Sequence, residues 1–593
     1  MKTNNLVAFL ASLTGSQKRS SRRAWALIGI VLLTLCFSDS AGLAATTVWS
    51  GSSSGGDFNT DSNWTSLAPG HTSASDLGIF NSSTNVNGTI TFSADITHFR
   101  TFVQDTSGTI SFDTGPYKWT MTSFFLTGTG AGEVNTIREI GGTIQSDFIL
   151  LGNDPGSSNN SIEVTGAGTL WNNTNTGAAV RIGSGGSNNS TFTIHNGGKV
   201  TTSGQTTLGL VGSSNGRLYV TDTGVLVTAN YLGVGHSAGA ANATNNEVDI
   251  LNGGTVTASH TLMGITTGAT DNKTLVSGSG STLTLTGVGT QSQIGMAGVN
   301  NTLQIDNGGS VLGGSKFRLG VGAASTGNQL IINDGTLAGT GIEAIRGDVA
   351  ITNSNVDLSD FFSVPDSAYI EGTLAATGAG TSSISFNSGT VKTVNSNIAN
   401  GSQFAVGDGG ANAATFIMKK TGSNDNGTHT FANGLFLNSN AVLMGSGNIV
   451  GNVSGAAGAQ VNVGSSPGLI NVAGNWDNTG MTVGLEIGDL SASTLPGVGY
   501  DLLDINGAFT HGGSLVIDTS GYVPGPIGEL KLVGWTSDVG STANTAVSFI
   551  GGAPMNYQFR SDGFYVTNIP EPSTLAFGLL ALGICLGRRS TKR

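Results

Sequence analysis

The stretch "EVDILNGGTV" (residues 247–256) decides the fold of this chain. Its apolar residues Val248, Ile250 and Val256 stand at positions i, i+2 and i+8, with an Asn-Gly-Gly turn at 252–254. Residues two apart on a β-strand face the same side of the strand. The turn breaks the strand where a positive φ angle is needed. The stretch therefore predicts two short strands whose apolar residues point inward.

Three other stretches keep this register, namely "TFTIHNGGKV" (191–200), "RLYVTDTGVL" (217–226) and "TLQIDNGGSV" (302–311). Apolar-Gly pairs also recur 24 to 31 residues apart, from Leu151-Gly152 to Leu319-Gly320. Each unit thus holds three strand-like pieces in about 25 residues, close to one coil of a parallel β-helix. We expect aliphatic side chains at matching positions to stack from coil to coil.

An antiparallel meander is the alternative, because Asn-Gly is also a strong hairpin signal. The β-helix is favoured because the longer variation falls in one place, the polar loop after the apolar-Gly strand, as in "HSAGAANATNNE" (236–247). A solenoid tolerates insertions on one face of the coil. We predict an all-β fold: an elongated right-handed parallel β-helix with flanking irregular β segments, and hydrophobic targeting helices at both ends.

The repeats are most regular in the middle of the chain and loosen on both sides. The expected segments are a signal peptide (1–45), an N-terminal β segment or cap (46–149), regular solenoid repeats (150–344), irregular solenoid (345–439), a closing β segment (440–568) and a sorting signal (569–593). In the cap, Trp49, Phe58, Trp64 and Phe80 are bulky enough to plug an open end of the solenoid. Stacking of Trp49 and Trp64 against sugar is the alternative.

Composition excludes several classes of function. The 593 residues include 93 Gly, only 10% are charged, and the formal net charge is −12. Without 1–45 and 570–593, the body holds 24−9=15 basic and 36−2=34 acidic residues, a net charge of −19. Such a body is not drawn to nucleic acid or anionic lipid. Both cysteines, Cys36 and Cys585, lie in the two ends, so the body has no disulfide and no cysteine-based metal site.

The first 45 residues resemble an export signal. A basic region (18–23) precedes an apolar run from Ala24 to Phe37, and "SAGLAA" (40–45) offers small residues for cleavage. The alternative is an uncleaved membrane anchor, but the run is short for a spanning helix, which needs about 20 apolar residues.

The tail "PEPSTLAFGLLALGICLGRR" (570–589) closely resembles the PEP-CTERM sorting signal. The matching residues are the tripeptide Pro570, Glu571 and Pro572, the apolar run 575–587, and the basic stop Arg588 and Arg589. The resemblance implies recognition by an exosortase, a membrane protease-transferase of Gram-negative bacteria that make extracellular polysaccharide. The apolar run would hold the tail in the bilayer while the arginines stay cytoplasmic. A simple C-terminal anchor would explain the run but not the tripeptide.

The body resembles the autotransporter-like β-strand-repeat proteins often joined to that signal. The resemblance rests on Trp49, Gly51, Asn63 and Trp64, on "GSGNIVGNVSGAAGAQVNVGSSPGLINVAGNW" (445–476), and on "YDLLDINGAF" (500–509). It implies a surface or matrix protein and assigns no chemistry.

No catalytic constellation stands out in the sequence. Glycan-active β-helices need clustered carboxylates, whereas here the acids are scattered. Asp501 and Asp504 are the closest interesting pair, but residues three apart on a strand face opposite sides. The seven histidines, at 71, 98, 195, 236, 260, 429 and 511, share no metal-ligand spacing. We therefore expect no catalytic residue, no metal and no cofactor.

The sequence thus favours an exported, exosortase-processed structural or adhesive protein of the bacterial cell surface or extracellular polysaccharide matrix. Its expected partners are an exosortase, extracellular polysaccharide and, transiently through both ends, the inner membrane. The alternative is a β-helix glycan-active enzyme, a polysaccharide lyase or hydrolase.

Overall fold

A computed structural model describes residues 45–567, apart from 72, 82–85, 105–107, 131, 237–241, 365–368, 371–372, 375–381, 421–426, 465–466, 524–527 and 553, and without the side chains of 360–381. The proposed export signal and the tail from residue 568 lie outside the described residues. Within these ranges no helix is long and apolar enough to cross a membrane.

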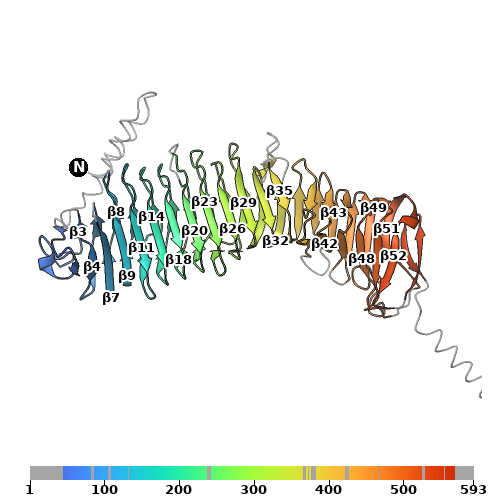
Figure 1. Ribbon diagram of the computed structural model, residues 1–593, viewed down its shortest axis with the longest axis horizontal. Helices are drawn as coiled ribbons and strands as arrows, with labels where there is room; N and C mark the ends of the chain where they lie inside the picture. Colours follow the sequence, from blue (N-terminus) through green and yellow to red (C-terminus); the bar gives the residue numbers. More distant parts are fainter. Residues whose placement is uncertain are drawn as a thin grey trace, which may run out of the picture. The chain divides into compact units, whose positions relative to one another are not determined.

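The described chain is a stack of β coils in which almost every strand pairs in parallel with a strand of the next coil (Figure 1). In the regular part each strand pairs with the one three places later, as β11–β14, β12–β15 and β13–β16 do. The chain therefore visits three ladders in turn, which we call faces A, B and C. This pairing is that of a β-helix and excludes the antiparallel meander.

Face A consists of β2 (Gly55–Asp57), β4 (Gly88–Thr91), β11 (Ser161–Thr165), β14 (Thr191–His195), β17 (Arg217–Val220), β20 (Glu247–Leu251), β23 (Lys273–Ser277), β26 (Thr302–Asp306), β29 (Asn328–Asn333), β31 (Gly347–Thr352), β35 (Ser383–Phe386), β38 (Phe404–Val406), β41 (Leu435–Leu437), β44 (Val453–Gly455) and β47 (Trp476–Asp477). Face B consists of β5 (Ile96–His98), β12 (Leu170–Asn173), β15 (Lys199–Thr202), β18 (Val225–Thr228), β21 (Thr255–Ala258), β24 (Thr282–Leu285), β27 (Ser310–Gly313), β36 (Gly389–Thr393), β39 (Ala414–Met418), β42 (Ala441–Gly445), β45 (Gln460–Val463), β48 (Thr482–Glu486), β50 (Ser514–Asp518) and β52 (Ala546–Ile550). Face C consists of β1 (Thr46–Val48), β3 (Leu77–Phe80), β6 (Arg100–Val103), β8 (Phe124–Thr127), β10 (Phe148–Leu151), β13 (Ala178–Ile182), β16 (Gln205–Leu208), β19 (Leu232–Val234), β22 (Thr261–Met263), β25 (Gln291–Ile294), β28 (Lys316–Leu319), β37 (Asn395–Ile398), β40 (Thr428–Phe431), β43 (Gly447–Val450) and β46 (Leu469–Ala473).

Some elements lie outside this simple scheme. Long strands that turn a corner belong to two faces: β7 (Thr109–Met121) and β9 (Thr136–Ser146) to A and B, β30 (Thr336–Ala344) and β32 (Ser354–Val364) to B and C, β49 (Leu502–Thr510) and β51 (Glu529–Val539) to A and C. The remaining elements are the hairpins β33 (Tyr369–Ile370)–β34 (Thr373–Leu374) and β53 (Asn556–Arg560)–β54 (Gly563–Thr567), and the 3-10 turns η1 (Asp61–Asn63) and η2 (Thr542–Asn544).

The core is built from the apolar positions that the sequence pattern singled out. Ile250 pairs in register with Val220 on one side and Val276 on the other, and all three side chains are fully buried. Val256 likewise stacks between its register partners on face B and is fully buried. The predicted aliphatic ladder is therefore confirmed.

In the Asn-Gly-Gly turn of residues 252–254, two residues adopt a positive φ. Asn252 itself has φ 49° and Gly253 has φ 82°. Gly254 is needed for a different reason: a Cβ there would lie 2.0 Å from the carbonyl oxygen of Val220 in the preceding coil. The turn thus rests directly on the backbone of its neighbour.

A second ladder inside the molecule is polar. Asn246, Asn272, Asn301 and Asn328 occupy the same place in four successive coils and are fully buried. Each of the first three donates its side-chain amide to the oxygen of the next, over 2.9 to 3.0 Å. Asn135 and Asn160 make the same contact at 2.8 Å. Such chains satisfy polar groups that would otherwise destabilise a buried corner.

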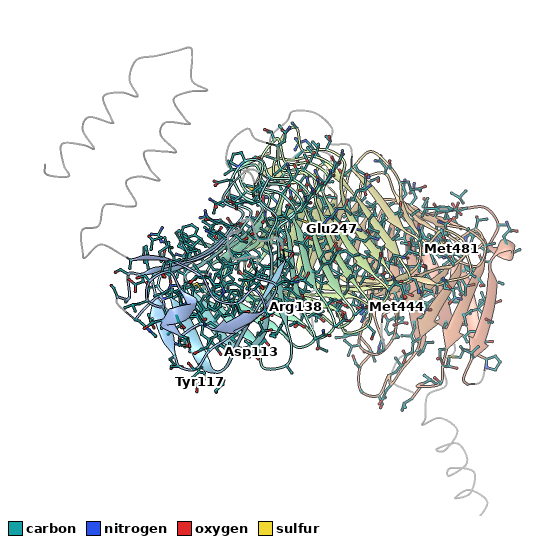
Figure 2. The ribbon with its side chains drawn as sticks, turned by 60° about the vertical axis from the view of Figure 1, so that its left-hand side comes forward. Asp113, Tyr117, Arg138, Glu247, Met444 and Met481 are labelled. Carbon is teal, nitrogen blue, oxygen red and sulfur yellow. The ribbon has the colours of Figure 1, made fainter. Side chains whose placement is uncertain are left out.

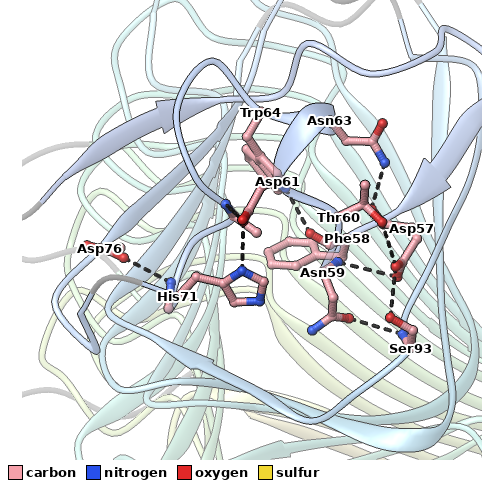
Figure 3. A network of polar contacts seen from close by, with 12 residues as sticks. Asp57, Phe58, Asn59, Thr60, Asp61, Asn63, Trp64, His71, Asp76 and Ser93 are labelled. Carbon is pink, nitrogen blue, oxygen red and sulfur yellow. Dashed lines mark hydrogen bonds and ion pairs between the residues drawn. The ribbon is translucent and has the colours of Figure 1, made fainter.

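Aromatic residues plug the N-terminal end, as predicted. Trp49, Phe58, Trp64 and Phe80 are at most 4% exposed, and the rings of Trp49 and Trp64 meet edge to face at 5.2 Å. The Trp64 indole donates to the carbonyl of Phe58 at 2.8 Å. Polar contacts surround this plug, among them an Asp61–His71 bond of 2.7 Å (Figure 3). Because the tryptophans are buried, sugar stacking on them is excluded.

The C-terminal end is closed by antiparallel pairing. Strand β54 pairs with β51 on one side and with β53 on the other. Beneath them Trp535 stacks on Phe509 with ring centroids 4.8 Å apart.

Candidate functional site

A groove crosses the outer side of face B in its last coils. It has a volume of about 460 Å³ and is lined mainly by β45, β48 and β50, with Ile550 of β52 at its end. Gly484 stands between Asn462 and Val516 in the outward row, so one side chain is missing there. Amide, hydroxyl and carboxyl groups border the hollow.

Three carboxylates line this groove although they are far apart in the sequence. Glu486 and Asp518 are register partners on β48 and β50, and Asp501 precedes β49. Asp501 is only 3% exposed. Burial raises the pKa of Asp501 from 3.8 to about 7, although two backbone amide hydrogen bonds oppose that shift.

The bonds of Asp501 give it a structural task. One oxygen accepts from the Gly468 amide at 2.5 Å and the other from the Glu486 amide at 2.6 Å. Asp501 thereby joins Gly468, in the stretch 445–476, to the strand that starts "YDLLDINGAF". Both of its oxygens are occupied, so it acts as a clamp between two segments that the sequence analysis had treated separately.

Asp501 and Asp504 do not converge, as predicted from their spacing. Asp501 is buried, whereas Asp504 is exposed on β49 and lies in register with Gly534 of β51.

The seven histidines are spread over the coils and have different neighbours. His71 contacts Asp61, His195 contacts Glu163, and His511 contacts Asp538. His98 and His429 are fully buried, and burial lowers the pKa of each to about 4. In the part of the chain that the structure describes, no three His, Cys, Asp or Glu side chains gather as a metal site would require.

Charged residues on the outer side of face A are paired across coils. Arg138 on β9 binds Glu163 at 2.5 Å, and Arg217 on β17 binds Glu247 on β20. Arg138 and Glu247 are labelled in Figure 2. Lys273 lies 3.6 Å from the second oxygen of Glu247. Each exposed pair of this kind adds little stability. The charges are nevertheless paired with residues of the neighbouring coil.

The residues proposed for sorting, Pro570, Glu571, Pro572, Arg588 and Arg589, all lie outside the described residues.

Sequence reasoning missed three features. The groove unites residues between 460 and 550 that share no short motif. The asparagine ladder was not predicted, because its members lie in Asn- and Ser-rich segments whose composition is typical of solvent-exposed loops. Glu139 was missed because it points inward on β9, fully buried and without a hydrogen-bond partner, in register with Phe112 and Val164. Burial raises its pKa well above 4.5.

No protein-family model matches this chain, and no curated protein matches it.

Proposed function

We propose that this protein is a structural or adhesive component of the bacterial cell surface or of the extracellular polysaccharide matrix. The observation that carries the proposal is the composition of the outward rows, where short polar side chains repeat from coil to coil. Thr255 stacks beside Thr282, and Thr257 beside Thr284. A repeating hydroxyl surface offers many weak contacts to a hydrated polymer and no focused reactive centre.

Side-chain hydrogen bonds tie these outward rows together. The hydroxyls of Thr482 and Ser514 lie 2.9 Å apart, and Asn471 donates to Asn448 at 2.8 Å. Similar bonds link neighbouring coils elsewhere, as between Thr201 and Asn172 at 2.8 Å. The rows therefore support a surface that is stable and uniform over many coils, which suits scaffolding or adhesion.

Export and processing complete the proposal. The chain would leave the cytoplasm through the signal in 1–45 and be held transiently by an apolar helix in the tail. An exosortase would then cut near Pro570-Glu571-Pro572 and release the protein to the cell surface or medium. We also propose that the coils wind in the right-handed sense.

The decisive experiment fractionates the native host with and without its exosortase. We expect the wild type to lose its tail and to reach the surface or medium. Without the enzyme, or with Ala-Ala-Ala in place of residues 570–572, the protein should stay in the inner membrane at full C-terminal mass. Deleting Arg588 and Arg589 is the matched control, because it removes the cytoplasmic stop and leaves the tripeptide. Exported protein that still ends at Arg593 by mass spectrometry would refute processing.

The groove supports a second candidate function, that of a glycan-active enzyme. The observation in its favour is that Glu486 and Asp518 lie side by side in register beside a hollow of about 460 Å³. The test is release of reducing ends or unsaturated products from host polysaccharide. Activity that Glu486→Gln and Asp518→Asn abolish, and that Asp504→Asn leaves unchanged, would establish the enzyme and displace the scaffold proposal.

A further inference from the structure

The last coil leaves one strand of face B with a single partner. Strand β52 pairs in parallel with β50, and none of the described residues pairs with its other edge (Figure 1). The hairpin β53–β54 covers only the part of β51 from Glu529 to Gly534, which belongs to face C. The hairpin therefore protects face C, while the outer edge of β52 stays open.

The hydrogen bonds of β52 show which of its backbone groups lie at the open edge. The Ala546 amide donates to a carbonyl just before β50 at 3.0 Å, and the Ile550 carbonyl accepts from an amide just after β50 at 2.9 Å. Backbone groups of successive residues in a strand point to alternate edges. The amides and carbonyls of Val547 and Phe549 therefore point away from β50, where they are available to a further strand.

The inward side chains of β52 are left partly exposed at this edge. Val547 and Phe549 continue the apolar ladder of face B, because they are the register partners of Leu515 and Ile517. Leu515 and Ile517 are fully buried, whereas Val547 and Phe549 are only partly buried. The ring of Tyr557, 6.3 Å from that of Phe549 between centroids, is 47% exposed. Covering this edge therefore removes apolar surface from water.

The composition of β52 lacks the features that usually protect an edge strand. Its sequence, Ala-Val-Ser-Phe-Ile, contains no charge, no proline and no glycine. Edge strands of natural proteins are commonly protected from other chains by charges, by proline or by a covering loop. Strand β53, for which the described residues give only β54 as a partner, does carry a charge: Arg560, which binds Glu529 through two bonds of 2.6 Å. The composition of β52 is therefore typical of a strand that pairs on both edges.

The N-terminal end of the β-helix is covered on all three faces. The segment between β2 and β3 lies against the first strand of each face. Thr65 donates its amide to the last carbonyl of β1, and the Asn63 side chain donates to the last carbonyl of β2, both at 2.8 Å. Gly70 lies so close to β5 that a Cβ there would be 2.4 Å from a carbonyl oxygen of that strand. Head-to-tail growth needs a receptive surface at both ends, so the open edge of β52 favours a closed pair of molecules.

We propose that β52 pairs antiparallel with β52 of a second copy of this chain, so that two molecules join by their C-terminal ends. A pairing centred on Ser548 is self-complementary, because Val547 then lies opposite the partner's Phe549. Side chains directly opposite each other in an antiparallel pair lie on the same face, so the apolar rows of the two copies meet. Val547 and the partner's Phe549 also exchange both backbone hydrogen bonds, since the groups at the open edge belong to these residues. The same patch serves both molecules, as in a two-fold symmetric dimer.

The first test places a cysteine at the centre of the proposed pair. The full chain is kept in mild detergent, and its only cysteines, Cys36 and Cys585, are replaced by serine. Ser548 and the partner's Ser548 form a non-hydrogen-bonded pair with about 4.5 Å between their Cα atoms, a distance that a disulfide spans. We expect Ser548→Cys to give a disulfide-linked dimer on a non-reducing gel after mild oxidation. Gln460→Cys, at an exposed position on a strand that is paired on both edges, is the matched control and should stay uncrosslinked.

The second test adds a charge at the same place. Ser548→Lys puts two ammonium groups opposite each other in the dimer, whereas the exposed side chain of Ser548 makes the folded monomer tolerant of the change. Sedimentation equilibrium measures the dissociation constant of the dimer, which we expect to rise at least about tenfold. Gln460→Lys adds the same charge three strands from the open edge, beyond the Debye length of about 8 Å, and should leave the constant nearly unchanged. Circular dichroism and the melting temperature establish that each variant is folded.

Four results would each overturn the proposal: a monomeric wild type, assemblies larger than a dimer, equal crosslinking at positions 548 and 460, or a dissociation constant that Ser548→Lys leaves unchanged. The last of these is also the result expected if the apolar ends of the chain, and not β52, hold the dimer together. The inference goes beyond the proposed function, because it concerns assembly and not a ligand. Exosortase-dependent export does not enter these assays, so failure here is distinct from failure of the proposed function.

Discussion

The N-terminal end of the β-helix is closed by side chains, whereas its C-terminal end is closed by backbone pairing. At the first, buried rings of Trp49, Phe58, Trp64 and Phe80 fill the opening. At the second, β54 lies between β51 and β53 and supplies hydrogen bonds to both. One solenoid can thus be closed by side chains that fill its opening or by a strand that pairs with its exposed edge. The two ends should therefore be sensitive to different substitutions.

The largest effect is expected at the N-terminal plug. Trp49→Ala removes a fully buried indole that packs against Trp64 and Phe80. We expect the free energy of unfolding to fall by about 4 kcal/mol. Tyr557→Ala in the C-terminal hairpin, where the ring is 47% exposed, should cost about 1 kcal/mol or less. Chemical denaturation of both variants measures this, and equal losses would mean that the plug does not close its end.

The C-terminal end should instead respond to loss of backbone pairing. Tyr565 lies in the middle of β54, opposite Lys531 of β51 and Gln558 of β53. Proline at this position removes an amide donor from a strand that is paired on both sides, and we expect a loss of about 3 kcal/mol. Tyr565→Ala keeps the amide and is the control, with a loss of about 1 kcal/mol. If the two variants have the same melting temperature, side-chain packing closes this end as well.

Acid should weaken the N-terminal end. His98 accepts a hydrogen bond from the Trp119 indole at 2.7 Å, and burial lowers its pKa to about 4. Below pH 6.5 the unfolded chain binds a proton that the folded chain does not, so stability falls as pH falls toward 4. At pH 5 this amounts to about 2 kcal/mol.

Hydrogen exchange of residues 96–121 at pH 7 and pH 5 measures this effect. His98→Gln keeps a hydrogen-bond acceptor and should reduce the acid sensitivity locally, while His429, whose pKa is also about 4, retains its own. Exchange in this segment that is independent of pH would contradict the prediction.

The smallest effect has the opposite sign. Glu139 is buried just beyond the plug, and its raised pKa keeps it protonated in the folded chain. Above pH 4.5 the unfolded chain releases that proton, so stability falls as pH rises. Glu139→Met should stabilise the protein by about 1–2 kcal/mol at pH 8 and remove the decline in stability as the pH rises above 4.5. Destabilisation by Glu139→Met would show that the carboxyl has a partner in solution.

The fold could be predicted from the sequence because its core follows a simple register. The positions of Ile250 and Val256, two and eight residues after Val248, determined which side chains point inward, and the structure buries all three. Asn272 could not be placed this way, since its role depends on asparagines 26 and 29 residues away that meet it only in the coiled chain.

The groove was even less accessible to sequence reasoning. The contacts of Asp501 with Gly468 and Glu486 span 33 and 15 residues of sequence. Long-range contacts of this kind follow from the number of residues in each coil. A small change in loop length would change the sequence separation of the contacting residues. No local sequence pattern therefore predicts these contacts.

The close packing at Gly254 restricts how such a chain can change its length in evolution. Gly254 lies close to the Val220 carbonyl, so the packing of this coil depends on the coil before it and not on the two ends of the β-helix. Duplication or loss of a whole repeat, such as residues 246–271, keeps an Asn-Gly-Gly turn resting on a strand carbonyl and leaves both end closures untouched. A change of a few residues within a strand misaligns every glycine after it. Selection on length should therefore act in whole repeats, and homologues should differ in size by multiples of one coil.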